Sequence, residues 1–417
     1  MATAYVYIYL EKGPVPAGVL ETVGTGRNAG ARFRYGNRYL EREDRIAIDP
    51  VQLPLPDAGV SREFATEERF NLFNGIRDGA PDGWGRHLMD RAAGALQLSE
   101  FDYLLATEDS RVGALAFGQD LNGPQRIAPW PEQIIDGEIL DLAGLLEAVK
   151  ALEAAEDLPS KHQRLLMCGS SLGGARPKAT TDYEGRKWIA KFGRNSDRNP
   201  ICKIEYVTMQ LASEVGINIP PIRLQSVLGQ DIYLIERFDR IPQGQDYRRI
   251  PFISGLTITG AHESESSQQS YRRLADQLRL YGSEPGQDAR QLWRRMVFNI
   301  FCNNNDDHLR NHGFLWDNRG WRLSPAYDIV ANPQVGTERD LAIGVGSDGR
   351  RATIANALTQ VASFGMGPAE CIAIAREMQN VVKHRWEQMC RENRFTELEI
   401  ERLRSCFIAC DEPLPNP

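Results

Sequence analysis

A polar stretch at residues 304–311 has the residue types and spacing that phosphoryl transfer requires. Asp306 and Asn311 lie five residues apart, and a third oxygen ligand, Asp328, follows within Ser-Pro-Ala-Tyr-Asp-Ile at 324–329. In a phosphoryl-transfer site, one Asp accepts the proton of the substrate hydroxyl. An Asn and a second Asp hold Mg²⁺ against the nucleotide phosphates. The stretch is therefore a candidate catalytic and metal-binding loop.

The flanking segments supply a framework for this loop. Apolar residues recur at helical spacing upstream, between Leu292 and Phe301, and two short strands are predicted at 312–316 and 321–323 around a turn at 317–320. Asp, Asn and His are also common in turns, so a polar loop without chemistry is the alternative. A helix, a polar loop and a hairpin that leads to an acidic residue favour the functional interpretation.

Lys191 is the second candidate, because the chain contains only eight lysines among its 49 basic residues. It lies in Trp-Ile-Ala-Lys-Phe at 188–192, which reads as a buried strand. A kinase needs a Lys on a strand to bridge the α- and β-phosphates, and a Glu on the next helix to orient it. Glu205 is placed fourteen residues later for that purpose. The alternatives are a Lys that reaches solvent from a strand edge and a Glu on a solvated helix face.

The glycine-rich segment at 168–178 admits two kinds of chemistry. Ser170, Ser171, Gly173, Gly174 and Ala175 can form a loop whose backbone N–H groups surround phosphates. Residues 169–173 also match the G-x-S-x-G elbow of serine hydrolases. That elbow needs a strand before it and a helix directly after it. Here a proline and a strand follow, which favours the phosphate loop.

For three other motifs, the surrounding sequence argues against the function that the motif suggests. Residues 344–349 match G-x-G-x-x-G, but no second strand of a βαβ unit follows, so a hairpin or loop is expected there. The chain contains no G-x-x-x-x-G-K-[ST], which excludes a P-loop. His308 and His312 are four residues apart, so they could bind zinc together if they lay on one helix. Asn311 and Gly313 argue against a helix there. We expect a packing or supporting role for His308.

Length and composition indicate an ordinary globular protein. A chain of 417 residues suggests two or three domains or lobes, and the net charge of −7 argues against a generic nucleic-acid binder. No apolar run reaches membrane-spanning length and no signal peptide is recognisable, so the expected location is the cytoplasm. The seven scattered cysteines predict free thiols without structural zinc.

Local patterns predict a β-rich start and a helical end. Alternating segments at 4–10, 18–23 and 31–35 predict a small antiparallel sheet. A helical pattern from Glu63 to Ile76 precedes a turn-rich insertion at 78–86. One helix is expected to start with Asn199 as the cap and Pro200 at the first helical position and to end at Gly216. A strand is expected over 232–238. The other helices are expected over 87–98, 139–155, 266–281, 288–303, 351–364, 368–390 and 395–410.

In combination and order, these motifs resemble the HipA family, the kinase toxins of bacterial HipA–HipB toxin–antitoxin pairs. The resemblance rests on the early strands, Ser-Leu-Gly-Gly-Ala-Arg-Pro-Lys at 171–178, Ile-Ala-Lys, Glu-Arg-Phe-Asp-Arg at 236–240, the Asp-x-His-x-x-Asn loop and Tyr-Asp-Ile. It implies an α+β, two-lobed, atypical protein-kinase-like fold with a mixed β-rich N-lobe and an all-helical C-lobe. The implied parts are a β-rich subdomain with a helical insertion (1–125), an N-lobe core (126–240) and a helical C-lobe (241–417).

The resemblance also implies roles for particular residues. Asp306 would be the catalytic base, Asn311 and Asp328 the Mg²⁺ ligands, and Lys191 the phosphate-binding lysine. The implied nucleotide contacts also include Ser170, Ser171, Gly173, Gly174, Ala175, Glu205, His308 and the hinge residues Glu236, Arg237 and Phe238. Ser171 matches the serine that family members autophosphorylate, with Ser170 as a neighbouring possibility. Phosphate there would repel ATP phosphates and expel the loop.

The activity implied is an ATP- and Mg²⁺-dependent serine/threonine protein kinase. Its substrate would be an aminoacyl-tRNA synthetase similar to glutamyl-tRNA synthetase. A helix-turn-helix antitoxin of the HipB kind would neutralise it and carry it onto operator DNA. A catalytically silent corepressor and a small-molecule kinase of the same fold are the alternatives.

The chain departs from the family pattern at two loop positions. Asp307 stands where a small Gly is expected, and Arg310 replaces a Lys. A carboxylate beside the base would raise the pKa of one of the pair or provide another metal contact.

Overall fold

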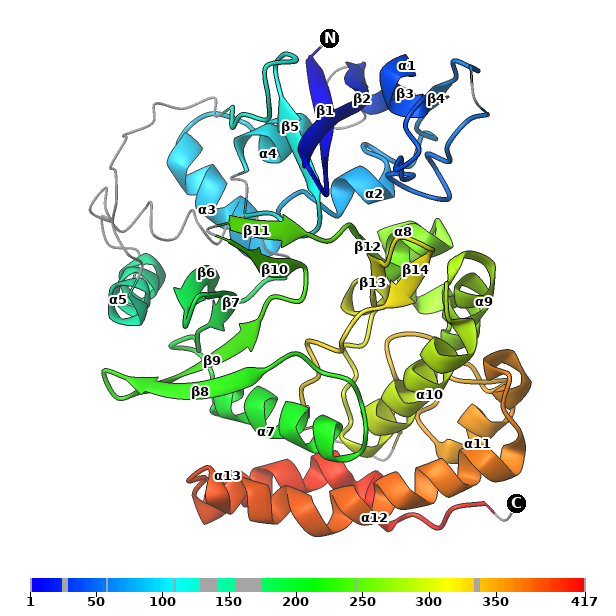
Figure 1. The fold of residues 1–417 in the computed structure, drawn as a ribbon. Helices are drawn as coiled ribbons and strands as arrows, with labels where there is room; N and C mark the ends of the chain where they lie inside the picture. Colours follow the sequence, from blue (N-terminus) through cyan, green and yellow to red (C-terminus); the bar gives the residue numbers. More distant parts are fainter. Residues whose placement is uncertain are drawn as a thin grey trace. The chain divides into compact units, whose positions relative to one another are not determined.

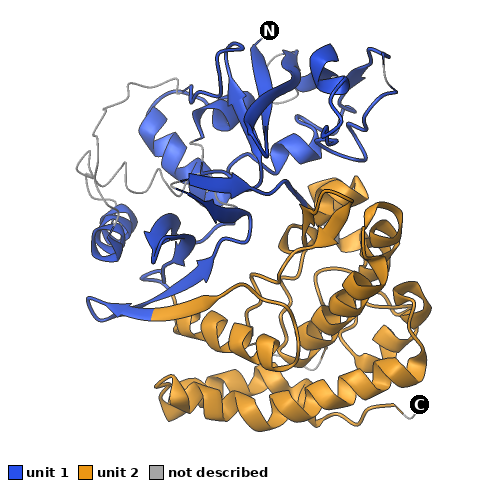
Figure 2. Cartoon of the chain, in the orientation of Figure 1, with its two compact units in different colours: residues 1–196, 225–253 blue, residues 197–224, 254–417 orange. Residues whose placement is uncertain are grey.

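The computed structural model describes residues 2–24, 29–57, 59–107, 110–127, 141–154, 174–244, 246–333 and 338–415. The chain forms two compact units (Figure 2). Unit 1 comprises residues 1–196 and 225–253, and unit 2 comprises residues 197–224 and 254–417. The boundary therefore crosses the chain three times. The predicted division at 125 and 240 stays a prediction.

Unit 1 begins with a five-stranded sheet in the order β4-β3-β2-β1-β5 (Figure 1). Its strands are β1 (Thr3–Leu10), β2 (Gly13–Val23), β3 (Gly30–Tyr35), β4 (Glu63–Ala65) and β5 (Leu115–Gly118). All four pairings are antiparallel, which confirms the predicted sheet. The helix expected from Glu63 is wrong: Phe64 pairs with Phe33 in strand β4, and only α2 (Asn74–Arg77) is helical.

The second sheet of unit 1 carries the predicted ATP lysine. Its order is β6-β7-β9-β8, formed by β6 (Lys178–Tyr183), β7 (Arg186–Lys191), β9 (Gln230–Glu236) and β8 (Ile222–Val227), which crosses the unit boundary. A two-stranded ribbon, β10 (Arg240–Gln243) and β11 (Asp246–Arg249), follows.

Helices α3 (Gly83–Ala93) and α5 (Leu142–Glu153) pack against the second sheet. With α2, the other short helices of unit 1 are α1 (Asn37–Leu40) and α4 (Glu100–Ala106). Trp84 and Met89 of α3 and Leu145 of α5 share one buried apolar cluster with Trp188 and Leu234 of the sheet. The predicted turn-rich insertion at 78–86 and the helix expected over 87–98 are wrong in part, because α3 already begins at Gly83 and ends at Ala93, followed by Gly94 with a φ of +63°.

Unit 2 is mainly helical. Its α-helices are α7 (Ile201–Glu214), α8 (Gly255–Thr259), α9 (Tyr271–Tyr281), α10 (Pro285–Phe301), α11 (Ile354–Leu358), α12 (Pro368–Glu392) and α13 (Glu397–Leu403). Its 3₁₀ segments are η2 (Glu263–Gln268), η3 (Leu309–Asn311), η4 (Val361–Phe364) and η5 (Arg404–Asp411). Helix α10 packs against α9 and α12 and buries Trp293, Phe298 and Phe301.

Several predicted helix starts are wrong by a few residues, and the cause is visible for two of them. Pro200 has a ψ of 76°, so it occupies the cap position of α7 without a capping side chain, and the helix starts at Ile201. The helix expected over 266–281 is split, because the Ser270 side chain accepts the N–H of Arg273 and starts α9 anew.

The predicted hairpin is confirmed as β13 (Gly313–Trp316) and β14 (Trp321–Leu323). The Asp317 side chain accepts the backbone N–H groups of Arg319 and Gly320, which fixes its turn. Strand β12 (Phe252–Ser254) joins this sheet at the unit boundary. The glycine-rich segment 344–349 is the predicted loop, closed by an antiparallel bridge between Gly346 and Gly349.

Six cysteines lie among the described residues, and all are buried free thiols, as predicted: Cys202, Cys302, Cys371, Cys390, Cys406 and Cys410. Cys168 lies outside the described residues. Within the described ranges, no helix combines the length and the apolar character that a membrane crossing requires.

Candidate active site

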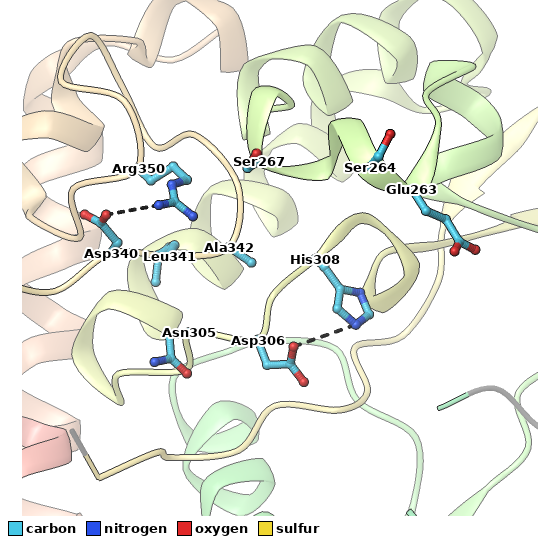
Figure 3. A pocket seen from close by; sticks show the side chains of 10 residues that line it. All are labelled: Glu263, Ser264, Ser267, Asn305, Asp306, His308, Asp340, Leu341, Ala342 and Arg350. Atoms are coloured by element: carbon cyan, nitrogen blue, oxygen red, sulfur yellow. Dashed lines mark hydrogen bonds and ion pairs between the residues drawn. The ribbon is translucent and has the colours of Figure 1, made fainter. Parts of the chain in front are cut away.

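The predicted catalytic loop leaves the end of α10 at Cys302 and reaches β13 at Gly313. Asn304 and Asp307 are buried within it, whereas the Asp306 side chain is 82% exposed. Figure 3 shows Asn305, Asp306 and His308 side by side along this loop. Asp306 therefore reaches solvent, while the buried side chains of Asn304 and Asp307 hold the loop in place.

A second loop brings Asp328 to the same place. The Tyr327 hydroxyl donates to the carbonyl of Arg310 at 2.7 Å. The Asn332 amide donates to the Asn305 side chain at 2.8 Å, and the Asn303 amide donates to the carbonyl of Asn332 at 2.7 Å. These bonds tie the Asp328 loop to the catalytic loop on both sides of Asp328.

Asp328 has an unusual backbone conformation, with a φ of +56°. Left-handed dihedrals are costly for a residue with a Cβ and persist where the surroundings enforce them, often at functional sites. The hydrogen bonds of Tyr327 and Asn332 supply that enforcement.

The electrostatics of Asp306 reflect this proximity. The surrounding loops remove part of its hydration, which raises the pKa of Asp306 even though the side chain reaches solvent. His308, whose Nε2 atom is 3.8 Å from Oδ1 of Asp306, lowers the pKa, and the Asp328 carboxylate raises it. A raised pKa brings a carboxylate closer to the value that suits a general base near neutral pH.

The donor atoms of this region fit Mg²⁺. The Asn311 amide nitrogen donates to the carbonyl of Asp306 at 2.7 Å, which leaves the amide oxygen as the ligand atom. Mg²⁺ prefers oxygen ligands and is commonly bound through one or two carboxylates plus substrate phosphates. A divalent cation would also relieve the repulsion between the Asp306 and Asp328 carboxylates. No cluster of three or more His, Cys, Asp or Glu suited to a metal occurs in the described ranges.

A pocket of about 540 Å³ opens beside Asp306 (Figure 3). It lies wholly within unit 2, and its walls come from η2, the catalytic loop and the segment 340–350. Asp340 pairs with Arg350 at 3.4 Å on one wall, and Glu263 pairs with Arg310 on another. The pocket provides polar space beside the predicted base for a group that carries a hydroxyl.

Asp307 points into the protein interior. Its side chain accepts the Tyr271 hydroxyl at 2.5 Å and the backbone N–H of Ala342 at 2.6 Å. Burial raises the pKa of Asp307 to about 6, and the neighbouring Asp306 adds to the shift. We expected either a raised pKa or another metal contact at this position, and the surroundings of Asp307 produce the raised pKa.

His312 is a packing residue. Its ring lies edge-on to Tyr271 with centroids 5.3 Å apart, and its Nε2 atom is 3.2 Å from the carbonyl oxygen of Asp307. Burial and the charge of Arg295 lower the pKa of His312 to about 3. It is therefore neutral at physiological pH and stabilises the loop.

In unit 1, Lys191 is buried at the end of β7, with its ammonium 5.7 Å from the ring centroid of Tyr233. Lys178 of β6 stands directly opposite Lys191 in the antiparallel register and is also buried. Opposed residues of an antiparallel pair project to the same face. Two ammonium groups on one face make a positive site suited to phosphates. Sequence reasoning missed Lys178, although the register of the two strands around the Glu184-Gly185 turn would have indicated it.

The end of the glycine-rich loop is anchored on α3. Gly174, with a φ of +93°, donates its N–H to Asp82 at 3.3 Å, and its carbonyl accepts the N–H of Trp84 at 3.0 Å. The Trp84 indole donates to the carbonyl of Lys178 at 3.1 Å, and Arg194 donates to the carbonyl of Ala175. Ser170, Ser171 and Gly173 lie outside the described residues.

The predicted hinge segment is held by a buried ionic cluster in unit 1. Arg237 donates to both carboxylate oxygens of Asp239, at 2.9 and 2.8 Å, and to the carbonyl of Ser110. Asp239 also accepts the N–H of Gly113. The two adjacent arginines, Arg237 and Arg240, keep the pKa of Asp239 well below its usual value, although burial acts in the opposite direction. The Arg237 side chain is thus committed to this cluster, and its backbone N–H donates to the carbonyl of Lys187 at 2.8 Å.

The remaining predicted nucleotide residues are placed as follows. Glu236 ends β9 and pairs with Arg186 at 2.6 Å, and the ring of Phe238 stacks on Phe252. Glu205 is buried on α7 of unit 2, whereas Lys191 belongs to unit 1. Their predicted pairing stays a prediction.

Two family models match the chain. The HipA N-terminal domain matches residues 7–118, and the HipA-like C-terminal domain matches residues 170–386, more than half of the 417 residues. The chain belongs to the HipA family.

Individual relatives agree with this HipA assignment. The putative kinase Y4mE of Sinorhizobium fredii is 24% identical over 79% of this chain and 78% of its own length. The serine/threonine-protein kinase toxin HipA of Shewanella oneidensis is 24% identical over 39% of this chain and 43% of its own. A solved complex of HipA, HipB and operator DNA from Shewanella oneidensis MR-1 matches with a TM-score of 0.69. That match has 17% identity and covers 98% of this chain and 96% of the matched chain.

The structural match shows that the chain has the HipA fold, which confirms the predicted α+β kinase-like class. Within the described residues, unit 2 departs from an all-helical lobe through the hairpin β13–β14, through Ser254 of β12 and through the first residues of β8 (222–224).

Proposed function

We propose that this protein is an ATP- and Mg²⁺-dependent serine/threonine protein kinase. The observation that carries the proposal is the exposed Asp306 carboxylate beside an open pocket, with Asn311 and Asp328 tied to the same loop. Membership of the HipA family, whose curated relatives include proteins named as kinases, supports it.

In the proposed reaction, Asp306 accepts the proton of a substrate hydroxyl whose oxygen attacks the γ-phosphorus of ATP. The bond from the γ-phosphorus to the bridging oxygen breaks, and ADP leaves. Asn311 and Asp328 would hold Mg²⁺, which neutralises charge on the phosphates when bound. Lys191, with Lys178 beside it, provides positive charge for the α- and β-phosphates. Gly174, Ala175 and His308 would complete the phosphate surroundings, and the backbone of Glu236–Phe238 would contact adenine.

We further propose that the kinase is the toxin of a toxin–antitoxin pair. Its partner would be a helix-turn-helix antitoxin of the HipB kind, which would bring it to operator DNA. Its substrate would be an aminoacyl-tRNA synthetase similar to glutamyl-tRNA synthetase, and it would autophosphorylate on Ser171, or on Ser170. The family assignment supports these proposals.

The test is incubation of the purified, dephosphorylated protein with labelled ATP and Mg²⁺, followed by mass spectrometry of tryptic peptides. We expect phosphate on Ser171 or Ser170, and its loss in Asp306→Ala, because general-base catalysis contributes about 10²- to 10⁴-fold. The matched control is Asp276→Asn, because Asp276 is an exposed carboxylate on α9 that pairs with the surface residues Arg272 and Arg279 of its own helix. Retained ATP binding without any phosphate transfer would overturn the kinase proposal in favour of a corepressor.

A further inference from the structure

Asp307, which follows the predicted base directly in sequence, is buried, and its contacts reach two other segments. The Asp307 carboxylate is 1% exposed and accepts two hydrogen bonds. One comes from the Tyr271 hydroxyl of α9, and the other comes from the backbone N–H of Ala342. Ala342 lines the pocket beside Asp306. One side chain thus joins the catalytic loop, α9 and a second wall of the pocket.

The network returns to the catalytic loop on the other side of Asp306. The Asn299 amide donates to the Tyr271 hydroxyl at 2.8 Å, and the Asn304 amide donates to the Asn299 side chain at 3.1 Å. All four side chains are buried. Asn304 and Asp307 are therefore the two ends of one buried chain of hydrogen bonds, and the half-buried Asn305 and the exposed Asp306 lie between them.

We propose that Asp307 is a positioning residue that fixes Asp306 and the Ala342 wall of the acceptor pocket relative to each other. The inference rests on the proposed kinase function and deepens it, because it assigns a role to Asp307. Asp307 itself does not contact the substrate.

The hydrogen-bond inventory explains why a carboxylate is needed. The Tyr271 hydroxyl accepts from Asn299, so its own hydrogen must go to Asp307. The Ala342 N–H also needs an acceptor. A carboxylate offers two acceptor oxygens, whereas the Asn amide offers one acceptor and one donor group. Asp307→Asn therefore leaves one of the two donors unsatisfied, and Asp307→Ala leaves both.

The experiment compares Asp307→Ala, Asp307→Asn and Tyr271→Phe with a matched control, Asp49→Asn. Asp49 is a buried carboxyl group of unit 1 that accepts backbone N–H groups of Val51, Gln52 and Gly75, and its pKa is also raised to about 6 by burial. The acceptor is the full-length Asp306→Ala chain at varied concentration. The measured quantities are kcat, KM for the acceptor and KM for ATP, all per folded enzyme.

We expect Asp307→Ala to lower kcat by about 10- to 100-fold and to raise the acceptor KM, with the ATP KM unchanged within about twofold. Asp307→Asn should recover part of the loss. Tyr271→Phe should add little to Asp307→Ala in the double variant, since both act through one network. Asp49→Asn should change neither KM. If Asp307→Ala behaves like Asp49→Asn per folded molecule, Asp307 only stabilises the fold and the proposal is overturned.

Hydrogen exchange separates this proposal from the kinase function. Peptides that span 304–312 and 339–345 should exchange faster in Asp307→Ala than in the wild type or in Asp49→Asn, whether or not phosphate is transferred. Faster exchange in both peptides supports the link between the two loops even if the wild type proves inactive. Unchanged exchange of the 339–345 peptide would overturn it.

Discussion

Asp49 shows at the residue scale how a buried carboxyl group makes stability depend on pH. Its folded-state pKa of about 6 is above the ordinary value of 3.8, so the folded chain retains a proton that the unfolded chain releases between these values. The stability contributed by Asp49 is therefore present at low pH and is lost as pH rises toward 6. The linkage amounts to at most about 3 kcal/mol.

We predict that Asp49→Asn costs more stability at pH 4.5 than at pH 7.5, because Asn does not titrate. The free energy of unfolding in urea, measured for both proteins at both pH values, tests this sign. A cost that is constant or that rises with pH would contradict the assigned shift.

Asp328 gives a second prediction at this scale, because its φ of +56° favours residues that tolerate the left-handed region. Asn is such a residue, so Asp328→Asn should keep the melting temperature within about 2 °C. It should also weaken the Mg²⁺ dependence of ATP-analogue binding by about tenfold or more, since a charged ligand is lost. Asp348→Asn is a control. Unaltered Mg²⁺ dependence would exclude Asp328 as a ligand.

The type and order of residues in the sequence indicate candidate site residues, whose roles stay predictions, but they do not indicate residues that are defined by side-chain direction. Asp306, Asn311 and Asp328 stand out because polar ligands at fixed spacing are rare by chance. Lys178 could not be recognised without the pairing of β6 with β7, and the orientation of Asp307 depends on α9 and on Ala342, which are distant in sequence.

At the element scale, helix α3 acts as the support for the end of the glycine-rich loop. We predict that Asp82→Ala weakens ATP binding about fivefold, because the Gly174 N–H loses its acceptor, at a cost of about 1 kcal/mol. Asp90 lies on the same helix and accepts a hydrogen bond from the Tyr103 hydroxyl of α4, so Asp90→Asn is the control. Calorimetric titration with an ATP analogue measures both. Equal affinities for Asp82→Ala and the wild type would mean that the anchor does not influence the nucleotide site.

Helices and strands were predicted correctly where the hydrophobic periodicity was strong. The predictions failed for short segments whose structure depends on pairing with a distant strand or on a single capping residue. The strands at 4–35, the helix α12 and the hairpin β13–β14 follow directly from their patterns. Strand β4 was missed because three residues cannot show alternation, and its existence depends on pairing with β3. The split before α9 was missed because Ser270 acts as a cap inside an otherwise helical pattern.

At the scale of the whole molecule, residues 225–253 of unit 1 lie in sequence between the two segments of unit 2, and strand β8 contains residues of both units.

The interleaved boundary of the units also affects how the chain folds during synthesis. Residues 1–196 leave the ribosome well before β9, yet β7 needs β9 as its neighbour, with Lys191 opposite Tyr233. Until residue 236 has emerged, β7 presents an unpaired edge beside the apolar side chains of Trp188 and Phe192. Helix α7 of unit 2 is made during this interval, before the sheet of unit 1 is complete. The nascent chain is thus most prone to aggregation at this stage, and this is where a chaperone would act.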